Sequence, residues 1–193
     1  MRVTAEPVRR LRRAERHDQI VSAATRAFAR AGFAATSLDD IAAEAGISRV
    51  ILYRHFESKT DLYRAVLDRA CLRLVSTVGE DEFDATSVGA LLDAAAEDPD
   101  AFRLLFHHAA REPDFRAEVD RLWAGAVEIA RRYYTAVIRD PAWATWAAQL
   151  TPTVVIDAVI AWLDAGQPDR EHAADRVLHL LAAITEAAQA RDR

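Results

Sequence analysis

Apolar residues recur every three or four positions along most of the chain, which is the spacing of one helical face. Over residues 13–31 this stripe consists of Ile20, Ala23, Ala24, Ala27, Phe28 and Ala31. We expect Gly32 to end this helix in a left-handed conformation, with Phe33 packing back on the last turn. No alternating strand pattern appears anywhere, so the sequence predicts an all-α fold.

Capping signals divide the following segment into short helices. A serine and an aspartate at the ends of 37–40 form a capping box and predict a helix to about residue 45. Gly46 breaks that helix, and a third is expected over 48–56, where the first residue is a serine that can cap it. A second serine and aspartate pair opens a longer helix over 58–78.

The remainder is also predicted to be helical after an acidic, turn-forming loop over 79–87. Pro99, Pro113 and Pro141 suit the first turns of three helices, since proline needs no partner for a backbone N–H there. A proline at 152 should bend the third of these, and a last helix is expected at about 169–190.

Composition narrows the class of protein. Hydrophobic residues make up 51% of the 193 positions, as in packed globular domains. A single cysteine, Cys71, forbids an intrachain disulfide and favours a reducing, cytoplasmic setting. No apolar run approaches the roughly 20 residues that span a bilayer, so we expect no membrane association.

Charge is divided unevenly along the chain. Residues 1–66 carry 12 Lys and Arg against 8 Asp and Glu, whereas residues 67–193 carry 13 against 22. Most of the positive excess lies in an arginine-rich arm over 1–16. This predicts a polyanion-facing end joined to an acidic body. Charge alone is equally compatible with a disordered basic leader.

The segment Ala42-x-x-x-Gly46-Ile47 has the pattern of a helix-turn-helix. It combines a small residue where two helices cross, a glycine at the turn and an apolar residue after it. Short helical hairpins are common, so this pattern alone is only moderately specific. We interpret 1–66 as a candidate DNA-binding domain and 67–193 as a second helical domain.

The third helix supplies a candidate DNA-reading face. If Leu52 and Phe56 point inward, steps of 100° per residue place Val50 and Arg54 on the opposite side. Tyr53 and Ile51 then flank a surface without an acidic side chain. Arg49 and Arg54 can reach guanine edges or phosphates, and Val50 or Ile51 can contact a thymine methyl.

The run from Gly32 to Ser48, followed by Leu52-Tyr53-Arg54-His55-Phe56-Glu57-Ser58-Lys59, resembles the DNA-binding domain of the TetR family of bacterial repressors. The resemblance covers about residues 13–66. It implies a homodimer that binds a double-stranded DNA operator without a cofactor. It also implies a C-terminal domain, here 67–193, that forms the dimer and binds a small-molecule effector, and it is the binding of this effector that releases DNA.

The resemblance also implies particular DNA contacts. Thr36 and Ser37 match residues that touch phosphate, and Tyr53 and His55 match residues that contact the backbone beside the recognition helix. Lys59, the only lysine of the chain, matches a phosphate-binding lysine. The complete set of expected DNA-binding residues is Thr36, Ser37, Arg49, Val50, Ile51, Tyr53, Arg54, His55 and Lys59.

Three residues depart from the family pattern. Val50 and Ile51 stand where the family often has glycine followed by threonine or serine, so a polar base reader is missing. Asp39 stands where many members have arginine or another DNA-facing residue. We hypothesise that the arm over residues 1–12 compensates by entering the minor groove or following phosphates.

Bulky aromatic residues concentrate in 99–165 and suggest an apolar cavity with a few polar groups. The candidate ligand-binding residues are Phe102, Phe106, His107, Trp123, Tyr133 and Trp146. Polar groups that could orient a ligand are His107, His108, Gln149, Thr151 and Asp157. A well-filled core is the alternative explanation for any single aromatic residue.

The family resemblance implies that the last two long helices pair with those of a second copy. Their apolar positions are Val155, Val159, Ala161, Trp162, Val177, Leu181, Ile184 and Ala188. Burying this stripe in a dimer would set two recognition helices about one duplex turn, roughly 34 Å, apart on a palindromic site.

The leading interpretation is a ligand-responsive repressor that is not an enzyme and holds no metal. One alternative is a DNA-binding regulator without an effector. Another is a helical enzyme or metal-binding protein that uses His107, His108 and Glu112, of which the last two lie four apart on one helical face. No nucleophile elbow, P-loop or dinucleotide fingerprint is present.

Overall fold

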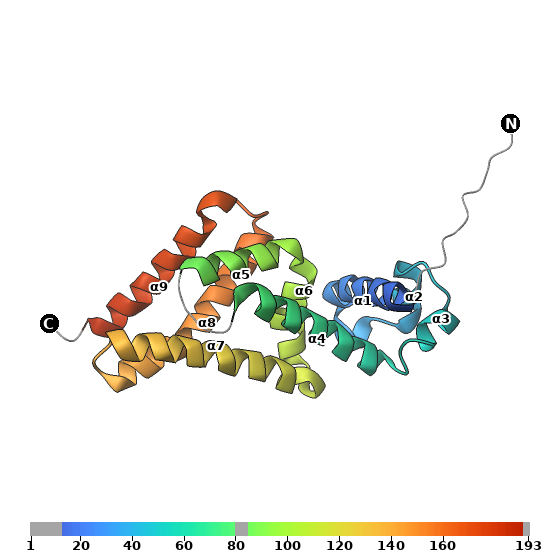
Figure 1. Cartoon of the computed structure of the whole chain (residues 1–193), viewed down its shortest axis with the longest axis horizontal. Coiled ribbons are helices and arrows are strands. Elements are labelled where there is room, and N and C mark those ends of the chain that lie inside the picture. Colours follow the sequence, from blue (N-terminus) through green and yellow to red (C-terminus); the bar gives the residue numbers. More distant parts are fainter. Residues whose placement is uncertain (1–12, 80–84, 191–193) are drawn as a thin grey trace. The chain divides into compact units, whose positions relative to one another are not determined.

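The computed structural model describes residues 13–79 and 85–190, and these form helices and short connections (Figure 1). The predicted all-α fold is confirmed. The chain divides into two compact units, Met1–Val66 and Leu67–Arg193, with the boundary inside one helix. The proposed minor-groove arm over 1–12 lies outside the described residues.

The first unit contains three helices and the beginning of a fourth. The elements are α1 (Arg13–Ala35), α2 (Leu38–Glu44), α3 (Arg49–Tyr53) and the start of α4 (Lys59–Val78). Five of the six predicted stripe residues of α1 are buried, and only Ala31 is exposed. The backbone leaves helical geometry at Gly32, with φ of 75°. Phe33 then turns back, with its ring centroid 6.1 Å from Phe28 and 5.0 Å from Tyr63.

Both ends of α2 are capped by hydrogen bonds, at its start through side chains and at its end through the backbone. The predicted capping box is present, because the Ser37 hydroxyl accepts from the N–H of Asp40 and the Asp40 carboxylate accepts from the N–H of Ser37. At the other end Gly46 has φ of 63°, and the N–H of Ile47 donates to the carbonyl of Ala42. This is the six-to-one hydrogen bond of a Schellman ending.

The third helix differs from its prediction in two respects. Ser48 occupies the N-cap position of α3, but its side chain makes no capping hydrogen bond. The α-helix ends at Tyr53, earlier than the expected residue 55 or 56. Backbone hydrogen bonds from His55 and Phe56 to the carbonyl of Leu52 continue the chain as a turn.

The second unit is built from the rest of α4 and the later helices. The elements are α5 (Ala85–Glu97), α6 (Pro99–Arg103), a π-helical turn (Leu104–His108), 3-10 turns (Ala109–Arg111 and Pro113–Phe115), α7 (Arg116–Val137), α8 (Pro141–Asp164), a 3-10 turn (Arg170–His172) and α9 (Ala173–Gln189). The predicted loop over 79–87 extended too far, since α5 already begins at Ala85. Pro113 opens a 3-10 turn, and the long helix begins three residues later.

Helix α8 is the central element of this unit and packs against α7, α9 and α5. It continues as one helix through Pro152. Among the described residues α8 alone is long and apolar enough to cross a membrane, with a mean hydropathy of 1.4 over its best window. This is an exception to the expected absence of such a segment. Core helices of globular bundles pass the same test, and the contacts of α8 within this unit are those of a core helix.

Candidate functional site

The outward face of α3 carries the side chains that the helical periodicity predicts. Leu52 and Phe56 point into the first unit, with exposed fractions of 0% and 6%. Val50 and Tyr53 are exposed by 64% and 44%, and Arg54 is also exposed. Ile51 is half-buried on the flank. The resulting surface combines apolar, aromatic and cationic groups and contains no carboxylate from α3 itself.

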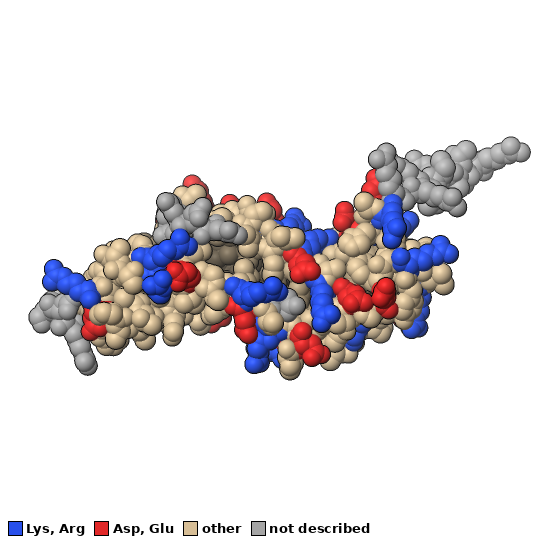
Figure 2. All heavy atoms as spheres, turned by 60° about the horizontal axis from the view of Figure 1, so that its bottom comes forward, with Lys and Arg blue, Asp and Glu red and all other residues tan. Residues whose placement is uncertain are grey.

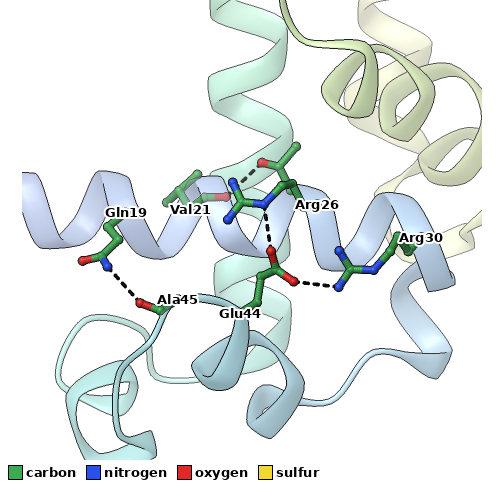
Figure 3. Close-up of polar contacts among 7 residues, drawn as sticks. Gln19, Val21, Arg26, Arg30, Glu44 and Ala45 are labelled. Atoms are coloured by element: carbon green, nitrogen blue, oxygen red, sulfur yellow. Dashed lines mark hydrogen bonds and ion pairs between the residues drawn. The ribbon is translucent and has the colours of Figure 1, made fainter.

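Polar contacts hold α2 against α1 and so fix the base on which α3 is mounted (Figure 3). Nε2 of Gln19 donates to the carbonyl oxygen of Ala45 over 2.8 Å. The carboxylate of Glu44 accepts hydrogen bonds from Arg26 and Arg30 over 2.8 and 2.9 Å. These two guanidinium groups hold the pKa of Glu44 below its ordinary value.

The first residue of α3 is held by two neighbours on the exposed surface. The Arg49 guanidinium forms an ion pair with Asp39 over 3.0 Å and donates to the Tyr53 hydroxyl over 3.2 Å. Its central carbon also lies 5.5 Å from the centre of the Tyr53 ring. The hydrogen bond with Tyr53 and the charge of Asp39 raise the pKa of Arg49. Many family members have arginine or another DNA-facing residue at the position of Asp39. In this chain Asp39 instead holds the Arg49 guanidinium beside that position.

The Ser37 side chain is exposed, but it is engaged in the capping box. Its hydroxyl donates to Oδ2 of Asp40 over 2.6 Å and accepts from the Asp40 N–H. Hydrogen bonds from the hydroxyl and N–H of Ser37 lower the pKa of Asp40. Ser37 can approach a phosphate only by exchanging or sharing these contacts.

Thr36 has a different environment from the one the family resemblance implies. Its side chain is 3% exposed, and the hydroxyl donates to the carbonyls of Gly32 and Ala27 over 2.7 and 3.3 Å. A buried hydroxyl that is satisfied by the main chain is not available to a phosphate. Thr36 therefore has a role at the end of α1, and a contact of its side chain with phosphate would require these hydrogen bonds to be exchanged.

Lys59 is likewise engaged inside the unit. Its ammonium donates to the carbonyls of Phe33, Thr36 and Ala34 over 2.8, 3.0 and 3.4 Å. It also lies 4.4 Å from the centre of the Phe33 ring. An ammonium has three N–H donors, and these three carbonyls can accept from all of them. Lys59 thus ties the start of α4 to the end of α1, and the phosphate contact that the family resemblance implies stays a prediction.

His55 lies half-buried beside α1. Burial, followed by the positive charges of Arg13 and Arg16 and the nearby His17, lowers its pKa. The His17 ring packs on Phe56 with a centroid separation of 5.0 Å. His55 is therefore close to the exposed face, in surroundings that disfavour its charged form.

Charges of both signs are interspersed over the face drawn in Figure 2. The counts of basic and acidic residues in the first 66 positions favour a polyanion most strongly at the arm, which the structure does not describe. The exposed cations on α3 and at its C-terminal end are Arg49 and Arg54.

A cavity of about 430 Å³ lies within the second unit. It is an open cavity lined by the later part of α4, by α5, by the π-helical turn and by α7 and α8. Two of the predicted ligand-binding residues, Phe106 and Trp123, line it. Its apolar walls also include residues that were not among the predicted ligand-binding residues, namely Leu74, Val75, Val78, Val88, Leu91, Leu122, Ile129, Val155 and Ile156.

The other four predicted ligand-binding residues do not line this cavity. Phe102 borders a separate, water-sized cavity of about 30 Å³. Tyr133 and Trp146 are exposed by 42% and 40%, and His107 is half-buried in the π-helical turn. The aromatic concentration indicated the correct region of the chain, but it did not show which ring faces the cavity.

Thr151 is the buried polar side chain on the cavity wall. It is 0% exposed, and its hydroxyl lies 2.9 Å from the Tyr134 hydroxyl. Burial raises the pKa of Tyr134. Arg121, Glu128 and Arg132 also border the cavity and are exposed on α7. These charged residues were not predicted, although their spacing of seven and four positions places them on one side of a helix.

The predicted dimer stripe is mostly part of the core of one copy. Val155, Val159, Val177, Leu181, Ile184 and Ala188 are each no more than 7% exposed within a single chain. Ala161 is exposed and Trp162 is half-buried. The periodicity correctly identified buried faces, but α8, α9 and α5 bury them against one another.

In the described part of the chain, no three His, Cys, Asp or Glu side chains gather as a metal site. His107 and His108 lie in the π-helical turn, and Glu112 follows the next 3-10 turn. The chain therefore does not keep the single helical face on which the spacing of His108 and Glu112 depended.

Residues 20–66 match the family model described as "Bacterial regulatory proteins, tetR family". The chain is 38% identical over 119 residues to the HTH-type transcriptional activator FasR of Mycolicibacterium smegmatis, covering 57% of this chain and 54% of that protein. It is 37% identical over 89 residues to the HTH-type transcriptional repressor SCO4008 of Streptomyces coelicolor, covering 46% of each. The matched segments thus span about half the length of these curated relatives.

The fold has a match over nearly the whole chain. A TetR-like transcriptional regulator from Rhodococcus sp. RHA1 superimposes with a TM-score of 0.76, covering 94% of this chain and 100% of that one at 23% identity. This likeness shows the fold alone. The family match over residues 20–66 and the sequence relatives, which are named as transcriptional regulators, show that the first unit of this chain is similar to the DNA-binding domain of the TetR family of bacterial regulatory proteins.

Proposed function

We propose that this protein is a transcriptional regulator that binds a palindromic operator as a homodimer and releases it when a small molecule enters the second unit. The observation that carries DNA binding is the exposed face of α3. Leu52 and Phe56 anchor this short helix, while Val50, Tyr53 and Arg54 remain at the surface. A helix presented in this way can lie in a major groove.

The contacts of α3 sort into two kinds. Arg54 is suited to a phosphate or a guanine edge, and the apolar Val50 is suited to the methyl group of thymine. Arg49 is positioned by Asp39 and Tyr53 before DNA arrives. A guanidinium that is already oriented loses less conformational freedom when it binds.

The homodimer requires a surface other than the stripe that is buried within one copy. Trp146 on α8 and Leu180 on α9 are exposed by 40% and 44%. Ala183 and Ala187 lie near Leu180 in the helical repeat and are also exposed. We infer that this outer face of α8 and α9 pairs with its symmetry copy. Two recognition helices would then address successive major grooves, roughly 34 Å apart.

The cavity in the second unit supports an effector. Its volume of about 430 Å³ lies within the range of about 300–1,000 Å³ that is typical of small-molecule sites. Leu74, Val75 and Val78 of α4 form part of its wall, and α4 begins at Lys59 in the DNA-binding unit. A ligand that prefers one position of α4 would shift the population away from the DNA-binding conformation.

The direct test is to sequence genomic fragments retained by the purified full-length chain. We expect recovery of an inverted repeat whose two halves are separated by about one duplex turn. The variant Arg54→Ala should lose that enrichment, whereas Arg116→Ala on α7 should keep it. Recovery of the same unrelated fragments by wild type and Arg54→Ala would contradict the proposal.

A regulator without an effector is the second candidate. It requires the aromatic region to be a filled core, and the apolar cavity among α4, α5, α7 and α8 favours a bound small molecule instead. The direction of regulation is proposed as repression. The named relatives include both an activator and a repressor, so a reporter assay with the recovered operator decides between the two.

A further inference from the structure

The wall of the second-unit cavity restricts what can be buried there. Apolar side chains from five segments form most of the wall. The buried polar group on the wall, the Thr151 hydroxyl, is already hydrogen-bonded to Tyr134. A polar group placed deep in this cavity would exchange its water for walls that are mostly apolar, and this is costly. The buried part of a ligand must therefore be apolar.

The rim on α7 has the opposite chemistry. Arg121 and Arg132 border the cavity at positions eleven residues apart, which corresponds to about 16 Å along a helix. Neither forms an ion pair of 4.0 Å or less with a described carboxylate. Nε of Arg121 donates to the Ala117 carbonyl over a long 3.3 Å. The rim thus offers two guanidinium groups to a ligand.

Glu128 lies between these two arginines, but it is already engaged. Both of its carboxylate oxygens accept hydrogen bonds from Arg131, over 2.7 and 2.8 Å. Hydrogen bonding and charge from Arg131, with a further contribution from Arg132, lower the pKa of Glu128. Since Arg131 offsets the charge of Glu128, the described residues of the rim on α7 carry a positive excess.

We propose that the cavity binds an amphipathic carboxylate, with its apolar body among Leu74, Phe106, Trp123 and Ile156 and its carboxylate at Arg121 or Arg132. This inference rests on the proposed effector function and specifies the class of the ligand. Arginine suits this role because its planar guanidinium binds carboxylates in a bidentate fashion and remains charged at all physiological pH values. The cavity volume is near the lower end of the usual range, which favours a body of modest length.

The test uses three probes with the same alkyl chain, namely decanoate, decanol and decylamine, titrated calorimetrically into the full-length protein below their aggregation concentrations. We expect decanoate to bind at least tenfold more tightly than either of the others. The double variant Arg121→Gln, Arg132→Gln should lose this preference and still bind decanol. Arg116→Gln, an exposed arginine of α7 outside the cavity lining, should behave as wild type.

A second variant tests the location of the alkyl chain. Ala126→Trp fills part of the cavity and should weaken the binding of all three probes, with the helical content unchanged by circular dichroism. Equal affinity for decanoate and decanol in wild type, retention of the preference in the double arginine variant, or no binding of any probe would overturn the proposal. These titrations are carried out without DNA, so they test the ligand class separately from the release of the operator. If decanoate binds as expected and the operator is not released, the ligand class stands and the proposed effector response fails.

Discussion

The ammonium nitrogen of Lys59 lies 2.8 Å from the carbonyl oxygen of Phe33, twenty-six residues earlier in the chain. Two further carbonyls and the Phe33 ring complete its surroundings. These carbonyls follow the break at Gly32, where the backbone leaves α1. The lysine therefore satisfies acceptors that the helix can no longer satisfy, and it fixes the segment that leads into α2.

Replacing Lys59 by methionine keeps an apolar stem and removes the donors. Hydrogen bonds to charged groups contribute about 1.5–3 kcal/mol each, so we expect the first unit to lose about 2 kcal/mol of stability. Amide hydrogen exchange in α1 should then accelerate about 30-fold.

Arg54→Met is the matched control, since it removes an exposed cation of the same unit. It should leave exchange in α1 unchanged and weaken DNA binding. Wild-type exchange in Lys59→Met, together with DNA binding reduced as strongly as in Arg54→Met, would support the phosphate contact implied by the family resemblance.

The ion pair between Asp39 and Arg49 leads to a second prediction. Asp39→Ala removes a carboxylate that repels phosphate and releases Arg49 from its 3.0 Å contact. One additional phosphate contact should steepen the dependence of log affinity on log salt by about 0.9. Affinity for random duplex should rise at low salt, so discrimination in favour of the operator should fall.

Filter binding or fluorescence anisotropy over a series of salt concentrations measures this slope. Asp68→Ala removes an exposed carboxylate from the part of α4 that belongs to the second unit and serves as the control for net charge. If both variants shift the slope equally, Asp39 has no specific role at the interface.

The sequence could predict the exposed face of α3, because Leu52 and Phe56 contrast sharply with Val50 and Arg54 at helical spacing. It could not predict the partners of Lys59, since these are main-chain carbonyls brought near by the turn at Gly32 and carry no side-chain signal. For α8 and α9, periodicity shows that a face is buried but not what buries it. Val159 and Leu181 therefore suggested a dimer interface, whereas they pack within one chain.

Val50 provides a test of base recognition, because it is apolar and 64% exposed on α3. Contact with a thymine methyl would bury about one methyl group, worth about 0.8 kcal/mol. Replacing the contacted thymine by deoxyuridine in the selected operator should therefore weaken binding about fourfold. Val50→Ala should bind the thymine and deoxyuridine operators equally.

Ile51→Ala is the companion variant, since Ile51 flanks the same surface and is half-buried. It should retain the sensitivity to deoxyuridine. Loss of sensitivity in Ile51→Ala alone would transfer the contact to Ile51, and insensitivity of the wild-type protein at every thymine would exclude methyl recognition by α3.

Glu44 links the stability of the first unit to pH. Hydrogen bonds from Arg26 and Arg30 place the pKa of the folded carboxyl below its ordinary value of 4.5. The unfolded chain therefore takes up a proton at a higher pH than the folded chain does, so this group stabilises the fold above about pH 4.5 and ceases to do so as pH falls through the folded pKa.

Glu44→Gln, which cannot ionise, should lower the unfolding temperature at pH 7 and differ progressively less from wild type below pH 4.5. Thermal unfolding monitored by circular dichroism at several pH values measures the difference. Glu57→Gln, at an exposed glutamate without an ion pair to the described residues, is the control for the loss of one carboxylate. A constant difference between wild type and Glu44→Gln across the pH range would mean that the ionised network of Figure 3 does not hold α2 on α1.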